Sequence, residues 1–198
     1  MNNIIFTAKK ENKAPALLNS NAMPFLTANF ETDVTRVQVD AKTPIYYLAS
    51  QAGFDQTLPG QITKQGLEIS KAYVDDDGNE VTRFEQGKEL TVRLRIRTLG
   101  SGTVRNVAVI DLLPGGFEVI RSSVPRTAYN WRADYVDVRE DRVVFYGDFT
   151  TSVKELSYRV KLTAAGSFTI PPAFVEAMYD RSKHANTLAG SFEVMSAK

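Results

Sequence analysis

The stretch that decides the fold is Leu90-Thr91-Val92-Arg93-Leu94-Arg95-Ile96-Arg97-Thr98. Apolar and polar residues alternate along its whole length, which is the period of an extended strand with one buried face. In a helix the four apolar residues would be scattered around the axis. Residues 90–98 therefore predict a half-buried β-strand whose outer face is rich in arginine.

The same alternation recurs in several short stretches between residue 66 and the last residues of the chain. Strands are expected near 67–72, 104–110, 117–120, 136–138, 143–146, 156–162, 168–170 and 192–194. Turn residues separate them, notably Asp77-Gly78-Asn79, Gly100-Ser101-Gly102 and Ala165-Gly166. Many short strands with frequent turns favour an all-β fold, an antiparallel β-sandwich over residues 63–198.

Residues 1–62 show a weaker pattern and predict a smaller, incomplete β unit. Val34–Val39 and Pro44–Leu48 are expected to form two strands, and Gly60-Gln61 is expected to end the unit. Two or three strands cannot close a core, so we expect their partner strands in a longer parent chain. The lysines follow the apolar run Ile4-Ile5-Phe6, the wrong order for a signal peptide. Either the protein is cytosolic or Met1 was added to a fragment.

Composition excludes several classes of function. Lys+Arg 24 against Asp+Glu 23 leaves a net charge of +1 without a basic stripe, so a nucleic-acid partner is not expected. With no cysteine, the chain has neither a disulfide nor a cysteine nucleophile. No apolar run approaches the roughly 20 residues that cross a bilayer, so direct membrane insertion is not expected.

Candidate chemistry is sparse. His184 is the only histidine and lies in a stretch expected to be a polar surface loop. Asp75–Glu80 resembles a calcium loop only loosely, because the alternating ligands and closing glutamate of an EF-hand are missing, and a hairpin turn explains it. Arg139–Arg142 is expected to be a turn with compensating charges. No nucleotide-binding or nucleophile-elbow motif is present. We therefore expect no enzyme activity, metal or cofactor.

Two segments go beyond a generic sandwich. Asp111–Glu118 joins a strand, the reversal Pro114-Gly115-Gly116 and an aromatic residue, and is expected to form a hairpin. In Phe168–Asp180, Pro171-Pro172 ends a strand and is followed by an apolar, aromatic stretch. Its part Ala173–Arg181 is expected to be a turn of helix or a packed loop. That loop is either tucked onto its own core or offered to a neighbour, and the residues leave both open.

These two segments, in this order, resemble the C-terminal macroglobulin domain of bacterial alpha-2-macroglobulins. The likeness covers roughly residues 43–198. Its motifs are Asp111-Leu112-Leu113-Pro114, Gly116-Phe117-Glu118, Tyr135–Val143, Pro171-Pro172, Glu176–Asp180 and Gly190, with Pro44–Tyr47, Ala52-Gly53-Phe54 and Gly66–Ile69 upstream. The resemblance implies a macroglobulin-type sandwich, with residues 1–62 as CUB-like strands of a split β-domain.

The resemblance also implies a role. Its parent would be a periplasmic protease trap, anchored to the inner membrane as a lipoprotein and serving in host defence, whose partners are target proteases. The terminal domain would pack on the thioester domain of the same chain, and Met178 and Tyr179 would shield the thioester from water. A thioester needs a Cys-x-Glu-Gln stretch, which this chain lacks. Either that stretch lies elsewhere in the parent, or the parent has no thioester.

Two alternatives remain at this stage. The stretch Val104–Phe117 is also similar to repeat domains of surface proteins, which would make the chain an immunoglobulin-like adhesin or structural repeat. A third hypothesis is a carbohydrate-binding sandwich that uses Tyr129, Trp131 and Tyr135. Aromatic residues at strand ends are more often packed in a core or at its rim, so this hypothesis is the weakest of the three.

Overall fold

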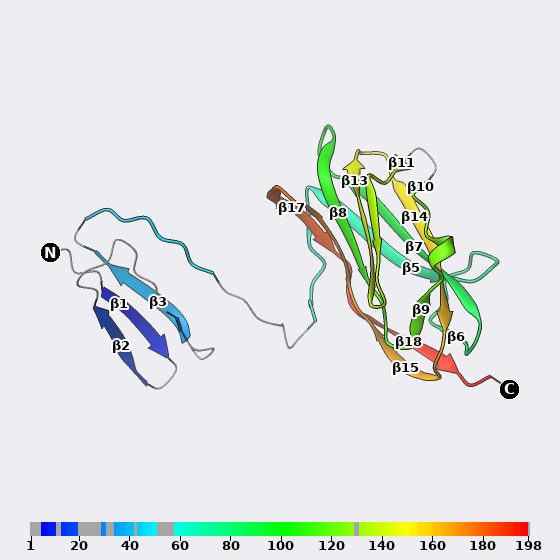
Figure 1. Ribbon diagram of the computed structural model, residues 1–198, viewed down its shortest axis with the longest axis horizontal. Coiled ribbons are helices and arrows are strands. Elements are labelled where there is room, and N and C mark those ends of the chain that lie inside the picture. The colour runs from blue at the N-terminus through cyan, green and yellow to red at the C-terminus, as the bar shows by residue number, and fades with distance from the viewer. Residues whose placement is uncertain are drawn as a thin grey trace. The chain divides into compact units, whose positions relative to one another are not determined.

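The computed structural model describes residues 5–10, 13–19, 29–30, 34–41, 43–50, 58–128 and 131–197. The chain divides into two compact units, Met1–Phe54 and Asp55–Lys198 (Figure 1). The border expected after residue 62 stays a prediction. Thr63 already belongs to the second unit, where its N–H donates to Asn186 Oδ1 at 3.0 Å.

The first unit contains an antiparallel three-stranded sheet. Its strands are β1 (Ile5–Lys10), β2 (Lys13–Asn19) and β3 (Val34–Asp40), in the order β2-β1-β3. The strand expected at Val34–Val39 is therefore confirmed, whereas the one expected at Pro44–Leu48 is wrong. Residues 44–48 form no strand, and the side chains of Tyr46, Tyr47 and Leu48 are exposed.

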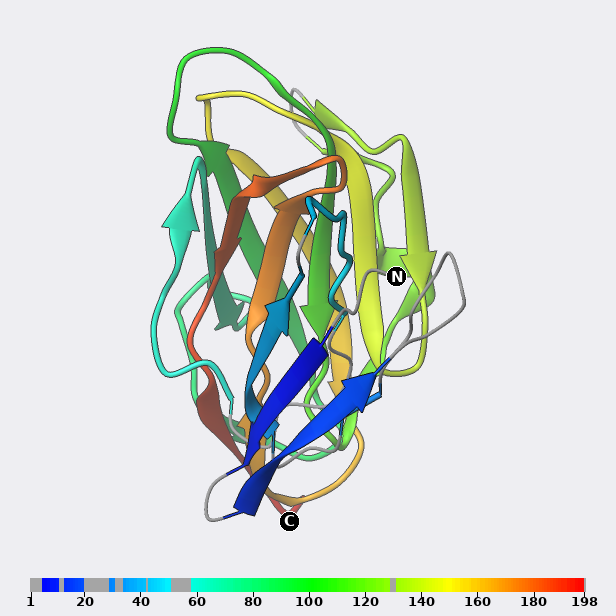
Figure 2. The ribbon, with the colours of Figure 1, turned by 90° about the vertical axis from the view of Figure 1, so that its left-hand side faces the viewer.

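The second unit is a β-sandwich, as expected (Figure 1). Its larger sheet has six strands in the order β12-β13-β8-β16-β17-β4, and the facing sheet has four in the order β5-β7-β14-β9. A third sheet, β15-β18-β6, lies at one end and contains the parallel pair β18–β6. Figure 2 shows the orange strands of the late sequence beside the green strands of the middle.

The strands β5, β7, β8, β9, β12, β13, β14, β15 and β18 lie close to expected stretches, whereas β4, β6, β10, β11, β16 and β17 were not expected as strands. The bounds of all these strands are β4 (Lys64–Gln65), β5 (Leu67–Val74), β6 (Arg83–Glu85), β7 (Glu89–Thr98), β8 (Val104–Leu112), β9 (Phe117–Val119), β10 (Thr127–Ala128), β11 (Trp131–Arg132), β12 (Tyr135–Val138), β13 (Arg142–Phe149), β14 (Lys154–Leu162), β15 (Gly166–Ile170), β16 (Ala173–Ala177), β17 (Asp180–Asn186) and β18 (Gly190–Met195). A short 3₁₀ turn covers Arg121–Ser123.

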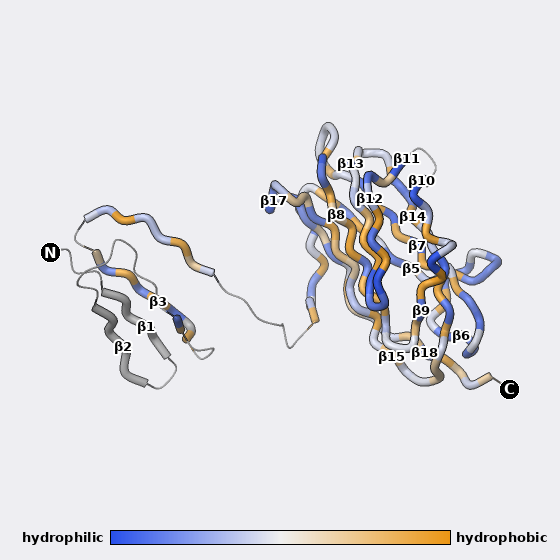
Figure 3. Tube along the Cα trace, in the orientation of Figure 1, coloured by the Kyte–Doolittle hydropathy of each residue, from blue (hydrophilic) through white to orange (hydrophobic). Residues whose placement is uncertain are grey.

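The core lies between the two larger sheets. β7 supplies four fully buried side chains, and its arginines face outward, where Arg95 Nε donates to Glu155 Oε2 at 2.8 Å. β14 pairs with β7 in register and buries the side chains that alternate along it. Most of the hydrophobic colouring in Figure 3 lies on the strands, and several turns are blue. Period-two alternation therefore identified β7 and β14 correctly.

The turn Pro114-Gly115-Gly116 is not a hairpin turn, contrary to expectation. β8 before it belongs to the six-stranded sheet, and β9 after it pairs with β14 in the facing sheet. The turn thus carries the chain across the sandwich. Gly116 has a φ of +74°, and a Cβ there would lie 2.7 Å from Cζ of Phe168, so glycine is required on both counts. Turn chemistry indicated the reversal correctly but not which sheet it leads to.

An ion pair is buried between the two sheets. Lys71 of β5 and Asp111 of β8 have side chains that are 3% and 0% exposed, and Lys71 Nζ lies 2.5 Å from Asp111 Oδ1. The Tyr158 hydroxyl donates to Asp111 Oδ2 at 2.6 Å, and Lys71 Nζ donates to the carbonyl of Leu112 at 3.0 Å. The Lys71 ammonium thus balances the buried charge at Oδ1, which has no hydrogen-bond partner among the described residues, and the Tyr158 hydroxyl satisfies Oδ2.

Two tyrosines stand beside this pair. Burial and the Asp111 carboxylate raise the pKa of the Tyr158 hydroxyl well above its ordinary value. The same two causes raise the pKa of Tyr73, whose buried hydroxyl has no hydrogen-bond partner among the described residues. The Tyr73 ring also meets Phe117 and Phe192 edge-on, with centroids 5.6 and 5.5 Å away, which connects the ion pair to the third sheet.

We expect Lys71→Met to lower the free energy of unfolding by about 3–5 kcal/mol, because it leaves the Asp111 charge buried without its partner. The double variant Lys71→Met/Asp111→Leu should cost less than the sum of the two single variants, because it leaves no buried charge. Urea unfolding measures both. Arg83→Met is the control: it breaks an exposed pair with Glu193 and should cost less than about 1 kcal/mol. Equal costs for Lys71→Met and Arg83→Met would contradict the expectation.

The raised tyrosine pKa values predict a loss of stability in alkali. In the unfolded chain the phenols ionise near their ordinary pKa of about 10, while in the folded chain they stay neutral to higher pH. The contribution of these two phenols to stability should therefore be constant below about pH 10 and be lost as the pH rises above it. Tyr73→Phe should weaken this dependence at little cost at neutral pH, because its hydroxyl is unpaired. Tyr158→Phe should weaken it too, but at a cost at neutral pH, because Asp111 loses a donor. Unfolding curves across the alkaline range check both variants.

Candidate functional site

Met178 and Tyr179, the two candidate site residues, form the turn of a β-hairpin. β16 precedes them and β17 follows, with Ala177 and Asp180 as the last pair before the turn. The expectation of a helical turn or packed loop over residues 173–181 is therefore wrong. Apolar residues at 174, 177 and 178 fit a helical face in sequence, but pairing with β8 and β17 decides the conformation instead.

The hairpin is anchored by its first strand. Pro171 and Pro172 end β15 and supply no N–H to a ladder. Along β16, Ala173, Val175 and Ala177 point into the core, and the strand pairs with β8 from Ala173↔Asp111 to Ala177↔Val107. The hairpin therefore begins within the six-stranded sheet, and its turn projects from one end of that sheet.

The turn itself is exposed. Met178 is 41% and Tyr179 84% exposed. The sequence left open whether this segment is tucked onto its own core or offered to a neighbour. Ala173, Val175 and Ala177 pack into the core of their own domain, whereas the two turn residues are exposed to solvent. Exposure of the pair agrees with the hypothesis that Met178 and Tyr179 face a neighbouring domain, whereas their shielding role stays a prediction.

The turn is held by a contact with a neighbouring strand. The Met178 N–H donates to the carbonyl of Asn106 at 2.9 Å. Asn106 has a φ of +53°, the one positive φ among the described non-glycine residues, and its N–H donates to Asp148 Oδ1 at 3.0 Å. Sequence reasoning missed Asn106 and Asp148. Asparagine tolerates a positive φ better than most residues, but one asparagine within a strand pattern is a weak signal.

Asp180 fixes the other side of the turn. Its Oδ1 accepts hydrogen bonds from the Ser182 hydroxyl at 2.5 Å and the Ser182 N–H at 3.2 Å, and its Oδ2 lies 2.9 Å from Lys183 Nζ. These contacts, the Ser182 hydroxyl first, lower the pKa of the Asp180 carboxyl to about 2. Hydrogen bonds thus lie on both sides of the two exposed turn residues.

The remaining candidates lie elsewhere. His184 is half-buried in β17, not in a loop, and its Nδ1 lies 3.0 Å from the Arg181 carbonyl. Trp131 is buried: its indole stacks on Phe149 with centroids 5.0 Å apart, and Nε1 donates to the Asp148 carbonyl at 2.8 Å. Tyr135 is exposed, and Tyr129 lies outside the described residues. A saccharide platform that uses the face of Trp131 is therefore contradicted.

Two acidic stretches form turns. Asp75 Oδ1 accepts the Asn79 N–H at 2.8 Å, and Gly78 has a φ of +83°, so Asp75–Glu80 is a turn as expected. In the turn 139–142, Arg142 Nη2 donates to Asp141 Oδ2 at 2.5 Å, which is the expected local charge compensation. Within the described ranges no group of three or more potential metal ligands gathers. No helix in the same ranges has the length and apolarity needed to cross a membrane.

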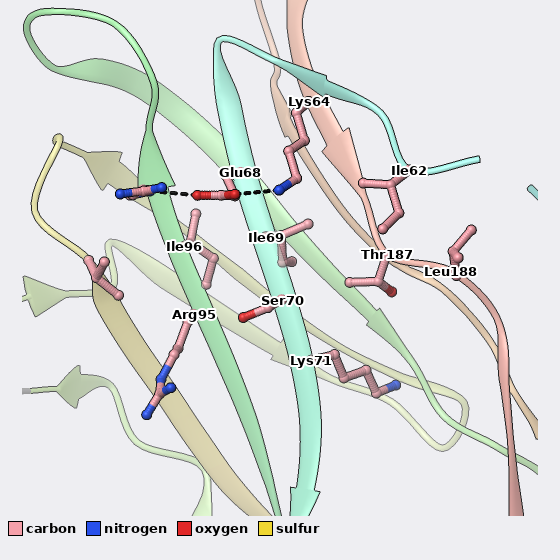
Figure 4. A pocket seen from close by; sticks show the side chains of 12 residues that line it. Ile62, Lys64, Glu68, Ile69, Ser70, Lys71, Arg95, Ile96, Thr187 and Leu188 are labelled. Atoms are coloured by element: carbon pink, nitrogen blue, oxygen red, sulfur yellow. Dashed lines mark hydrogen bonds and ion pairs between the residues drawn. The ribbon is translucent and has the colours of Figure 1, made fainter.

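An open groove of about 550 Å³ runs beside the free edge of β5 (Figure 4). Its exposed apolar residues are Ile62, Val153 and Leu188. Glu68 contacts Lys64 on one side and Arg97 on the other, both at 2.5 Å, and these contacts lower its pKa. The lining residues include neither histidine nor an unpaired carboxylate, so the groove offers no acid–base pair for catalysis.

The Asp180 carboxyl should titrate with a pKa of about 2. Because this pKa lies below its ordinary value, the contacts with Ser182 and Lys183 should be complete above about pH 4 and lost as the pH falls through 2. Carboxyl carbon shifts in NMR would follow the titration. Ser182→Ala should raise the midpoint, whereas Lys64→Ala, a lysine change in β4, should leave it unchanged. A midpoint near 3.8 in the unmodified chain would mean that these contacts do not persist in solution.

Much of the chain matches a known protein family. Residues 66–181, more than half of the chain, match the family model described as the bacterial alpha-2-macroglobulin MG10 domain. An alpha-2-macroglobulin homolog of Yersinia pestis is 34% identical over 92% of this chain and 10% of its own length. The alpha-2-macroglobulin of Pasteurella multocida is 32% identical over 78% of this chain and 8% of its own length.

A solved structure agrees in fold. Salmonella alpha-2-macroglobulin reacted with methylamine matches 96% of this chain and 13% of its own, with a TM-score of 0.68 and 19% identity. This likeness supports the macroglobulin-type β architecture and nothing finer. The present chain spans about a tenth of the length of the curated relatives that it matches. The match to the family model, together with these relatives, shows that the chain belongs to the bacterial alpha-2-macroglobulin family.

Proposed function

We propose that this chain is a non-catalytic domain of a protease-trapping alpha-2-macroglobulin, and that the Met178–Tyr179 turn covers a reactive bond on a neighbouring domain of the same parent. The observation that carries the proposal is the exposure of an apolar thioether and an aromatic ring at a turn that is hydrogen-bonded on each side. Large side chains on a monomer's surface are ordinary. An exposed apolar pair on a turn with hydrogen bonds on both sides is suited to docking.

The physical role of such a tip is to exclude water. An acyl bond such as a thioester persists only where water and amines are kept away from it. Tyr179 offers a broad, stiff ring that buries a large apolar area at a small entropic cost, and Met178 adapts its shape to an irregular surface. Because the turn that carries the two side chains follows a paired strand of a six-stranded sheet, a movement of the whole domain would carry the pair with it.

The proposal extends to the parent. It would be a periplasmic protein anchored as a lipoprotein to the inner membrane, with target proteases as its partners and a place in host defence. Cleavage by a protease would release this domain from its neighbour and expose the reactive bond. The chain itself has no cysteine, so a thioester would be carried by another domain of the parent, and this domain would protect it and react with nothing.

The family match argues against the adhesin alternative. That alternative rested on the similarity of Val104–Phe117 to repeat domains of surface proteins, whereas the family match covers that stretch and much more. The apolar side chains that 104–117 share with such repeats are explained by the sandwich core.

The proposed shielding by Met178 and Tyr179 can be tested in a full-length parent that carries a Cys-x-Glu-Gln stretch. Tyr179→Ala and Met178→Ala should each speed the reaction of the unactivated protein with methylamine, the amine with which the Salmonella relative has been reacted. A buried apolar side chain contributes about 1.5–3 kcal/mol to a contact, so we expect a 10- to 100-fold increase, about tenfold for each 1.4 kcal/mol. Release of the free thiol measures the rate.

Tyr135→Ala provides the matched control, since Tyr135 is also an exposed tyrosine, 61% accessible, but lies on β12. It should leave the methylamine rate unchanged. If Tyr179→Ala and Tyr135→Ala react at the same rate as the unmodified parent, the turn does not cover the reactive bond.

A further inference from the structure

A chain of three hydrogen bonds leads from the core to the Met178–Tyr179 turn. Trp131 Nε1 donates to the carbonyl of Asp148 at 2.8 Å. The side-chain Oδ1 of the same Asp148 accepts the Asn106 N–H at 3.0 Å. The Asn106 carbonyl in turn accepts the Met178 N–H at 2.9 Å. The three strands β11, β13 and β8 are thereby joined to the turn between β16 and β17.

The first link depends on the absence of a side chain. A Cβ at Gly147 would lie 2.7 Å from Cζ2 of Trp131, a distance that no stable packing allows. Glycine therefore lets the indole lie against β13, stacked on Phe149 with an angle of 28° between the rings. In that position Nε1 reaches the Asp148 carbonyl, and the buried indole N–H is satisfied.

The second link depends on a bulge. β8 pairs with β13 through Val107↔Gly147 and Val104↔Phe149, so Arg105 and Asn106 together lie opposite Asp148. An extra residue in the left-handed conformation is typical of a β-bulge, usually with glycine in that position. Here Asn106 takes it with a φ of +53°. The Asp148 carboxylate holds the freed N–H of Asn106 and so stabilises the bulge.

The third link, the hydrogen bond from the Met178 N–H to the Asn106 carbonyl, holds a turn that lacks the usual hairpin backbone conformation. Two-residue hairpin turns are usually of the types that need a positive φ, because those types match the twist of the strands. Neither Met178 nor Tyr179 has a positive φ, and the register between β16 and β17 shifts between Glu176 and Ala177. The conformation of this turn is therefore not fixed by its own backbone preferences, and the bond to Asn106 supplies a constraint from outside.

We propose that Asp148, Asn106 and Trp131 are positioning residues for the Met178–Tyr179 turn. They touch nothing that reacts. They set where the two exposed side chains stand relative to the six-stranded sheet, and hence how well the turn fits a neighbouring domain. The hydrogen-bond chain stands by itself, whereas its consequence for shielding rests on the proposed function.

The positioning can be measured in the chain itself, by the hydrogen-exchange rate of the Met178 amide in NMR. Asp148→Ala removes the acceptor that holds Asn106, and we expect the Met178 amide to exchange at least about fivefold faster, as the loss of one ordinary hydrogen bond predicts. Asp148→Asn retains a side-chain oxygen and should restore slow exchange. Asp137→Ala, which removes a paired carboxylate on β12, is the control and should change nothing.

The remaining links have their own variants. Asn106→Gly can keep the positive φ and should leave exchange at Met178 slow, whereas Asn106→Val opposes that conformation and should speed it. Trp131→Phe keeps an aromatic ring but removes the N–H, and should also speed exchange at Met178. An unchanged Met178 rate in Asp148→Ala and Asn106→Val would overturn the proposal, and an unchanged rate in Trp131→Phe would remove Trp131 from it.

The parent protein separates this inference from the proposed function. If both hold, Asp148→Ala speeds the methylamine reaction, and Asp148→Asn and Asp137→Ala do not. If Tyr179→Ala leaves the methylamine rate unchanged while Asp148→Ala still speeds Met178 exchange in the chain, the shielding fails and the positioning stands. If Tyr179→Ala speeds the reaction but Asp148→Ala changes neither rate, the shielding stands and the positioning fails.

Discussion

The sandwich is organised around the buried pair of Lys71 and Asp111. A charge taken out of water is costly, so each member must find its partner in one geometry. Lys71 comes from β5 and Asp111 from β8, which belong to facing sheets. The hydroxyl of Tyr158 in β14 donates a hydrogen bond to the second carboxylate oxygen of Asp111. A hydrophobic pair of similar volume could match its stability. What the ion pair adds is a constraint: a slip of one residue in β5 or β8 would leave a charge unpaired.

This constraint extends to the turn that we propose as the working surface. Asp111 lies opposite Ala173 in the pairing of β8 with β16. The residue that ties the two sheets together therefore also aligns the strand that leads to Met178 and Tyr179. Farther along the same β8, Asn106 meets the Met178 N–H. One strand thus sets both where the hairpin starts and where its turn stands.

Sequence reasoning predicted correctly the elements whose signal is local. It failed for elements whose conformation depends on the strands with which they pair. The alternation in Leu90–Thr98 was sufficient to place β7, because a half-buried strand needs that period whatever it pairs with. The residues of β1 and β2 include lysine, alanine and proline, which favour strands poorly, and these segments are strands because β1 pairs with both β2 and β3. The apolar residues of 173–181 fit a helical face as well as a strand. The residues Pro114–Gly116 predicted a turn, but not that the next strand belongs to the facing sheet. Exposure of Tyr179 followed from no pattern, since it depends on where the hairpin ends.

The position of β16 has a consequence for how the domain comes into being. β16 lies between β8 and β17 inside the six-stranded sheet, yet it comes more than sixty residues after β8 along the chain. Until the ribosome has released residues 173–177, β8 has one edge without a partner, and the core between the sheets is open to water. Pairing between such distant segments is slow and leaves strand edges exposed to aggregation. The six-stranded sheet therefore cannot be completed until residues 173–177 are available to fill the gap beside β8.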